Sequence, residues 1–101
     1  MKEYLEGEKD GVIKISASWC EPCRNFAPVF AMAEANNPGL FFVNADIDNL
    51  SHDMKLWLKS ELGIKTIPAV VFYKNEKPVR VVKGSETTVS ELQQVIDEVF
   101  T

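Results

Sequence analysis

The sequence has few of the residues that mark membrane, secreted or metal-binding proteins. It contains one histidine and two cysteines among 101 residues, and no apolar run approaches the ~18 residues that a membrane-spanning helix needs. The first ten residues, MKEYLEGEKD, are polar and charged, so they predict neither a secretory signal nor a membrane anchor. We therefore expect a cytoplasmic protein with no membrane partner.

Clustered basic residues are also missing. Eleven Lys and Arg are scattered among fifteen Asp and Glu, for a formal net charge of −4. Nucleic acid binding requires basic side chains grouped against phosphates, so we expect no nucleic acid partner. The balance of 46% hydrophobic and 26% charged residues is typical of a globular protein with a single core. We predict one domain over residues 1–101, acting as a monomer.

Hydrophobic periodicity predicts alternating strands and helices. Strands are predicted at 12–17, 40–45, 69–74 and 79–83, and helices over 21–35, 51–62 and 88–100. This order predicts an α/β fold in which a four-stranded mixed sheet has helices on both faces. The last two strands should form an antiparallel hairpin. Residues 1–10 are too polar to predict a strand, although Tyr4 and Leu5 fit a short helical turn.

Several single residues carry structural predictions. Thr88 and Glu91 have the spacing of a capping box. Pro28 falls inside a helical pattern that resumes beyond it, which predicts a kink and not a helix end. Trp57 lies in helical register with core positions. In the third strand, Phe72 is interpreted as core and Tyr73 as surface.

The segment WCEPC at 19–23 carries the chemistry. It lies where the first strand ends and the first helix begins, and a helix N-terminus favours a thiolate. We therefore predict Cys20, in an exposed position, as the nucleophile. Cys23 lies one turn deeper and can attack a mixed disulfide formed by Cys20. A disulfide across so short a loop adds little stability, so we expect a chemical role for the pair.

The same spacing is also found in half of a zinc site. Zinc normally takes four ligands, but the sequence has no second CxxC and its only histidine, His52, lies beside a predicted helix start. We therefore expect no metal, and we interpret His52 as a solvated residue.

A longer set of motifs resembles the thioredoxin family. The matching segments are ASWCEPCR at 17–24, AP at 27–28, DID at 46–48, GIKTIP at 63–68, FYKN at 72–75 and Gly84. The resemblance implies a thioredoxin fold with a shortened N-terminus that lacks the first strand of longer relatives. It implies reduction of protein disulfides through a redox-active Cys20–Cys23 disulfide, with no bound cofactor. Electron transport would then begin at a thioredoxin-reductase-type partner using NADPH.

The resemblance also implies a docking surface for protein disulfides. Pro68 would be a cis proline beside the cysteines, leaving the backbone of Ile67 free to pair with an extended substrate segment. Gly84 would flank the same groove, although it also fits a simple turn after a strand. Trp19, which precedes the nucleophile, and Pro22, which fits the first helical turn, would complete this surface.

Four residues depart from the family pattern. Glu21 stands where thioredoxins usually have glycine, and its carboxylate should oppose thiolate formation at Cys20 and select partners by charge. Lys14 stands where they carry a buried aspartate, Asn44 where they carry a lysine, and Ser16 where they often have tryptophan. A buried Lys14 must either reach water or lower its pKa. Beneath the site, it could accept the proton of Cys23 or stabilise its thiolate.

Two other functions are compatible with these residues. A binding or accessory module would keep the fold and use the groove to hold another protein. A glutaredoxin-like enzyme would use glutathione, whose carboxylates need basic or polar groups, and the sequence offers little beyond Arg24 and Lys65.

Overall fold

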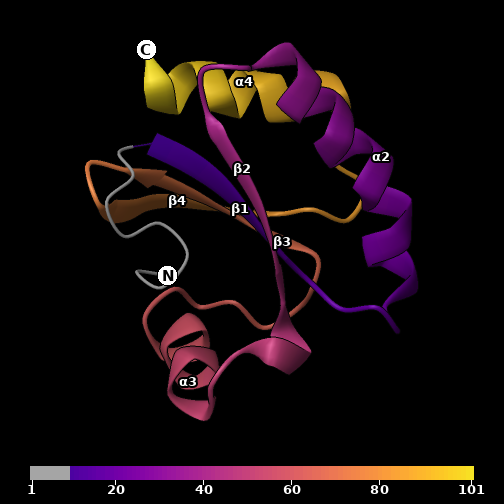
Figure 1. The fold of residues 1–101 in the computed structure, drawn as a ribbon, viewed down its shortest axis with the longest axis vertical. Helices are drawn as coiled ribbons and strands as arrows, with labels where there is room; N and C mark the ends of the chain where they lie inside the picture. Colours follow the sequence, from indigo (N-terminus) through magenta and orange to yellow (C-terminus); the bar gives the residue numbers. More distant parts are fainter. Residues whose placement is uncertain (1–9) are drawn as a thin grey trace.

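The structure, a computed structural model, describes residues 10–101. Its elements, drawn in Figure 1, are β1 (Asp10–Ser16), α2 (Glu21–Asn36), β2 (Phe41–Asp46), the 3-10 turn η1 (Ile47–Asn49), α3 (His52–Ser60), β3 (Ala69–Lys74), β4 (Lys77–Lys83) and α4 (Val89–Phe100). The predicted order of strands and helices is confirmed, and η1 was not predicted. The helical turn expected at Tyr4 and Leu5 and the expected absence of a first strand lie outside the described residues.

The strands form one mixed sheet in the order β2-β1-β3-β4. β1 runs parallel to β2 and antiparallel to β3, and β3 is antiparallel to β4. The helix α2 supplies the crossover that parallel neighbours require. β1 is therefore a central strand, and its register places Lys14 between Asn44 of β2 and Val70 of β3.

Hydrophobic cores cover both faces of the sheet. On one face, Ile13 and Val71 pack with Leu58 of α3. On the other, Val12 and Phe72 pack with residues of α2 and α4. Figure 1 shows α3 on the opposite side of the sheet from α4. Because side chains alternate along a strand, both faces of β1 and β3 are buried.

This two-sided burial corrects one expectation. Tyr73 is only 3% exposed and belongs to the core beneath α3, whereas the sequence predicted a surface position. The core position predicted for Phe72 is confirmed. Trp57 packs against the core cluster that contains Leu58, as its helical register predicted. His52 is exposed at the first residue of α3, as expected.

Local backbone signals explain where the elements end. The turn between β3 and β4 consists of Asn75 and Glu76, both with positive φ (53° and 66°), as a two-residue hairpin requires. β4 begins two positions earlier than predicted because Lys77 and Pro78 already pair with β3. The helix α2 continues through Pro28 to its end at Asn36, so this proline does not end the helix.

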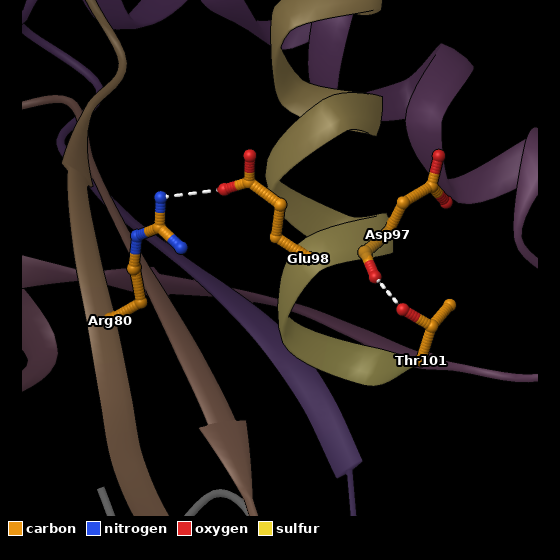
Figure 2. A network of polar contacts seen from close by, with 4 residues as sticks. All are labelled: Arg80, Asp97, Glu98 and Thr101. Atoms are coloured by element: carbon orange, nitrogen blue, oxygen red, sulfur yellow. Dashed lines mark hydrogen bonds and ion pairs between the residues drawn. The ribbon is translucent and has the colours of Figure 1, made fainter.

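The C-terminal helix is tied to the sheet by its buried face and by surface contacts. Leu92, Ile96 and Val99 are buried. Figure 2 shows the Arg80 guanidinium reaching from β4 to the Glu98 carboxylate, with an N to O distance of 2.8 Å. Both side chains of this ion pair are nearly half exposed, so it contributes at most about 1 kcal/mol. Burial therefore dominates the docking of α4.

The start of α4 provides a test of local stability. The Thr88 hydroxyl accepts from the backbone N–H of Glu91 at 3.1 Å, and the Glu91 carboxylate accepts from the N–H of Thr88 at 3.0 Å. We expect Thr88→Ala to lower the free energy of unfolding by about 1 kcal/mol, because a helix N–H loses its acceptor. Urea denaturation measures this loss, and the exposed Ser90→Ala in the same turn is the control. Equal losses in both variants would contradict the role of the cap.

Candidate active site

The two cysteines lie at the junction of β1 and α2, where the sequence placed them. Cys20 is the N-cap residue of α2, and its Sγ accepts a hydrogen bond from the backbone N–H of Cys23 at 3.2 Å. The two residues are joined by a disulfide. Pro22 occupies the first helical turn. On reduction, the N–H and the helix dipole would both stabilise a thiolate at Cys20.

The exposure of the cysteines differs from the sequence prediction. Cys20 is 5% exposed and Cys23 is 3% exposed, so Cys20 is not the open position that was expected. Both pack with Ala17 in a small apolar cluster, against which Ile47 and Ile67 also lie. The two cysteines therefore have nearly equal exposure. They differ in position, because Cys20 caps α2 and Cys23 lies within its first turn.

The loop before β3 passes directly beside Cys20. The Ile67 carbonyl oxygen lies 3.8 Å from the Cys20 Sγ. The Ile67–Pro68 peptide bond is cis, and the Pro68 side chain is fully buried. The structure thus brings together two segments that are 47 residues apart in the chain.

Gly84 packs against the other side of Pro68. Its N–H donates to the Pro68 carbonyl oxygen at 2.9 Å, and its own carbonyl oxygen accepts from the Thr87 N–H at 3.1 Å. A Cβ atom at Gly84 would lie 3.0 Å from Pro68 Cγ and 3.2 Å from Phe26 Cδ2. The missing side chain therefore makes room for Pro68 within the fold.

Trp19 and Glu21 flank the buried sulfur on the surface. The Trp19 side chain is 65% exposed, and its indole Nε1 donates to the Asp48 carboxylate at 2.9 Å. The Asp46 carboxylate in turn accepts from the backbone N–H of Asp48 at 2.9 Å. Glu21 is exposed at the first position of α2. The role of Asp48 in holding the indole was not predicted, although the DID segment at 46–48 was the available signal.

A cavity of about 220 Å³ beside Cys23 collects the unusual polar residues. Its lining includes Lys14, Ser16, Cys23 and Asn44, and the Ser16 hydroxyl donates to the Asn44 side-chain oxygen at 2.7 Å. Lys14 is 8% exposed, and this burial lowers the pKa of its amine from the ordinary 10.5. Three departures from the family pattern that are scattered along the sequence therefore meet at one place.

The two basic residues considered for glutathione do not share a site. Arg24 lines the cavity beside Cys23, whereas Lys65 lines a different cavity together with Val81 and Lys83. Across residues 10–101, no group of three or more His, Cys, Asp and Glu side chains could hold a metal ion. None of the helices in this described part is long and apolar enough to cross a bilayer.

The sheet order and the disulfide at the start of α2 define a thioredoxin-type domain. The thioredoxin family model matches residues 1–98, and the chain belongs to the thioredoxin family. Thioredoxin H5 of Oryza sativa is 34% identical over 92 residues, which cover 90% of this chain and 64% of that protein. Thioredoxin H-type 1 of Nicotiana tabacum is 35% identical over 95 residues, which cover 94% and 70%.

The chain therefore spans less than two thirds of the length of the rice relative. Solved structures agree on the fold. The oxidised thioredoxin from Plasmodium falciparum has a TM-score of 0.75 at 21% identity, covering 99% of this chain and 89% of its own. The reduced thioredoxin pre-protein of Schistosoma mansoni has a TM-score of 0.74 at 25% identity, covering 96% and 87%.

The contact between Gly84 and Pro68 yields a prediction about stability. We expect Gly84→Ala to lower the free energy of unfolding by about 1–3 kcal/mol, because the new methyl group overpacks a buried ring. Gly39→Ala is the matched control, since a Cβ atom there meets nothing within 4 Å. Chemical denaturation of both variants checks this expectation. A Gly84→Ala protein as stable as the control would contradict the close contact.

Proposed function

We propose that this chain is a thiol–disulfide oxidoreductase that reduces protein disulfides by dithiol–disulfide exchange. The observation that carries the proposal is the Cys20 sulfur at the cap of α2, which accepts the Cys23 N–H and is already bonded to Cys23. Membership of the thioredoxin family supports this chemistry. The redox-active disulfide itself is the electron carrier, so we propose that no bound cofactor is needed.

The exchange runs in two steps. In the reduced protein, the Cys20 thiolate attacks one sulfur of the substrate disulfide, that bond breaks, and the other substrate sulfur leaves as a thiolate. The Cys23 thiolate then attacks the Cys20 sulfur and releases the second substrate thiolate. Both released thiolates take up protons from water, and the chain is left with the Cys20–Cys23 disulfide. Two electrons have passed to the substrate.

We propose that Trp19, Pro22 and the backbone of Ile67 form the docking surface for the substrate segment, and that the buried Pro68 holds Ile67 beside Cys20. The exposed Trp19 directly precedes Cys20 in the chain, and the Ile67 carbonyl oxygen lies 3.8 Å from the Cys20 Sγ. A backbone group beside the sulfur can pair with an extended substrate chain, as in strand addition. Gly84 supports this surface indirectly, because its backbone N–H and carbonyl oxygen are already hydrogen-bonded to Pro68 and Thr87.

Glu21 gives this surface a negative charge. Its carboxylate is exposed one residue after the nucleophile, where it favours partners with basic side chains near the disulfide. The same charge opposes the formation of a second negative charge on Cys20. We therefore propose that Glu21 modulates both the choice of partner and the ease of thiolate formation.

For the electron donor, we propose a reductase of the thioredoxin-reductase type that uses NADPH. We propose that the chain acts as a monomer. We place it in the cytoplasm, because catalytic reduction needs a compartment that keeps the dithiol reduced. Glutathione is a weaker candidate, since Arg24 and Lys65 line different cavities. An accessory module would have no need for a sulfur held at the cap of a helix.

Catalytic turnover is the first test. We expect the protein to accelerate the precipitation of a two-chain protein whose chains are linked by disulfides, with dithiothreitol as the electron source, because Cys23 resolves each mixed disulfide. A rate equal to that of dithiothreitol alone would favour an accessory module. Faster turnover with glutathione as the electron source would favour the glutaredoxin-like alternative.

The roles of the two cysteines are the second test. We expect Cys23→Ser to accumulate a mixed disulfide through Cys20, because only Cys20 lies at the helix cap and its resolving partner has been removed. Cys20→Ser should trap far less substrate, and the double variant provides the background. A non-reducing gel followed by mass spectrometry measures the trapped species. Equal trapping by the two single variants would contradict the assignment.

A further inference from the structure

A largely buried lysine, Lys14, lines the same cavity as the resolving cysteine. Lys14 lies in the central strand β1 and is 8% exposed. Among residues 10–101, its amine makes no hydrogen bond or ion pair, and no polar side-chain atom in this part is both buried and unpaired. The amine must therefore reach solvent, and the cavity of about 220 Å³ that it lines is the route.

The resolving sulfur belongs to the same cavity. Cys23 of α2 lines it together with Lys14. The other charged groups at this cavity are Arg24 of α2 and Asp46 of β2, and the Asp46 carboxylate already accepts the Asp48 N–H. On β3, the neighbour of Lys14 is the apolar Val70. Lys14 and Cys23 therefore line one cavity, and no carboxylate among residues 10–101 is paired with the Lys14 amine.

The surroundings of the amine favour its charged form in one respect and oppose it in another. Its Nζ lies 5.2 Å from the centroid of the Phe30 ring, within the range in which an aromatic face attracts a cation. Burial acts in the opposite direction and lowers the pKa of the amine. The positive charge is therefore present at low pH and disappears as the pH rises through this lowered pKa, earlier than for a solvated lysine.

We infer that Lys14 is a positioning residue for the second step of the exchange, in which its ammonium group stabilises the Cys23 thiolate across the shared cavity. This inference rests on the proposed function and adds a residue to it. The Cys23 thiol loses its proton to cavity water, and its electron pair then forms the bond to the Cys20 sulfur. The bond from Cys20 to the partner breaks, and the partner sulfur leaves as a thiolate that takes a proton from water.

Direct titration of Cys23 tests the inference without any turnover. In a Cys20→Ser background, Cys23 is the only thiol, and its thiolate is followed by ultraviolet absorbance against pH. We expect Lys14→Met to leave about tenfold less thiolate at neutral pH, because a shift of one unit in the pKa is a factor of ten. Lys14→Arg should retain the thiolate, since it keeps the charge. The exposed Lys55→Met on α3 is the control for net charge.

Rapid-quench measurement of mixed-disulfide decay over about pH 6 to 9, where thiols titrate, gives the kinetic readout. Lys14→Met should resolve the mixed disulfide about tenfold more slowly at the low end of this range, because a smaller fraction of its Cys23 is ionised. It should approach the wild type at high pH, where Cys23 is ionised in both proteins. Lys14→Arg should keep the wild-type rate at low pH. Circular dichroism checks folding, and Lys14→Gln replaces Lys14→Met if the latter does not fold.

The outcomes separate the two proposals. Superimposable Cys23 titrations for wild type, Lys14→Met and Lys14→Gln would overturn the role of Lys14, even if the protein reduces disulfides. A wild-type protein without any reductase activity would overturn the proposed function. The titration would still show whether the Lys14 charge acts on Cys23.

Discussion

The position of β1 in the middle of the sheet is the constraint on which the rest of the structure depends. This strand is hydrogen-bonded to β2 on one edge and to β3 on the other, and its residues from Gly11 to Ser16 are all buried. A strand held on both edges and both faces cannot shift its register without moving every side chain to the opposite face. Its end point therefore fixes where α2 starts.

The reactive sulfur depends directly on this end point. Ala17 packs in the apolar cluster with the cysteines, and Cys20 caps α2 three residues later. β3, the antiparallel neighbour of β1, begins at Ala69, so the preceding loop carries Ile67 to the same end of the sheet. Gly84 then follows the end of β4 and packs on Pro68. Strand pairing thus assembles the site from segments that are distant in the chain.

The same burial explains the unusual electrostatics of this chain. A lysine on an exposed strand would have its charge screened by water, but in β1 the Lys14 side chain is only 8% exposed and its amine lies 5.2 Å from the centroid of the Phe30 ring. Charges interact more strongly in such surroundings than in bulk water. Polar residues at Ser16 and Asn44 keep the cavity hydrophilic and bond to each other. The charge of Lys14 is thereby tolerated next to the redox pair.

The sequence by itself determined what depends on local chemistry. The order of the elements, the capping box at Thr88, the hairpin turn and the placement of Cys20 at a helix start all follow from short-range preferences, because caps and turns are satisfied by neighbouring residues. The chemistry of the CxxC pair was also evident at this level. These predictions needed no knowledge of which surfaces pack together.

Only the tertiary structure decided what depends on packing between distant segments. It buried Tyr73 and Cys20, both expected at the surface, because the covering residues come from α3, from η1 at Ile47 and from the loop at Ile67. It brought Asp48 to the Trp19 indole and placed Lys14 and Cys23 at one cavity. Exposure and long-range contacts depend on how the whole chain packs, so periodicity along the sequence does not predict them.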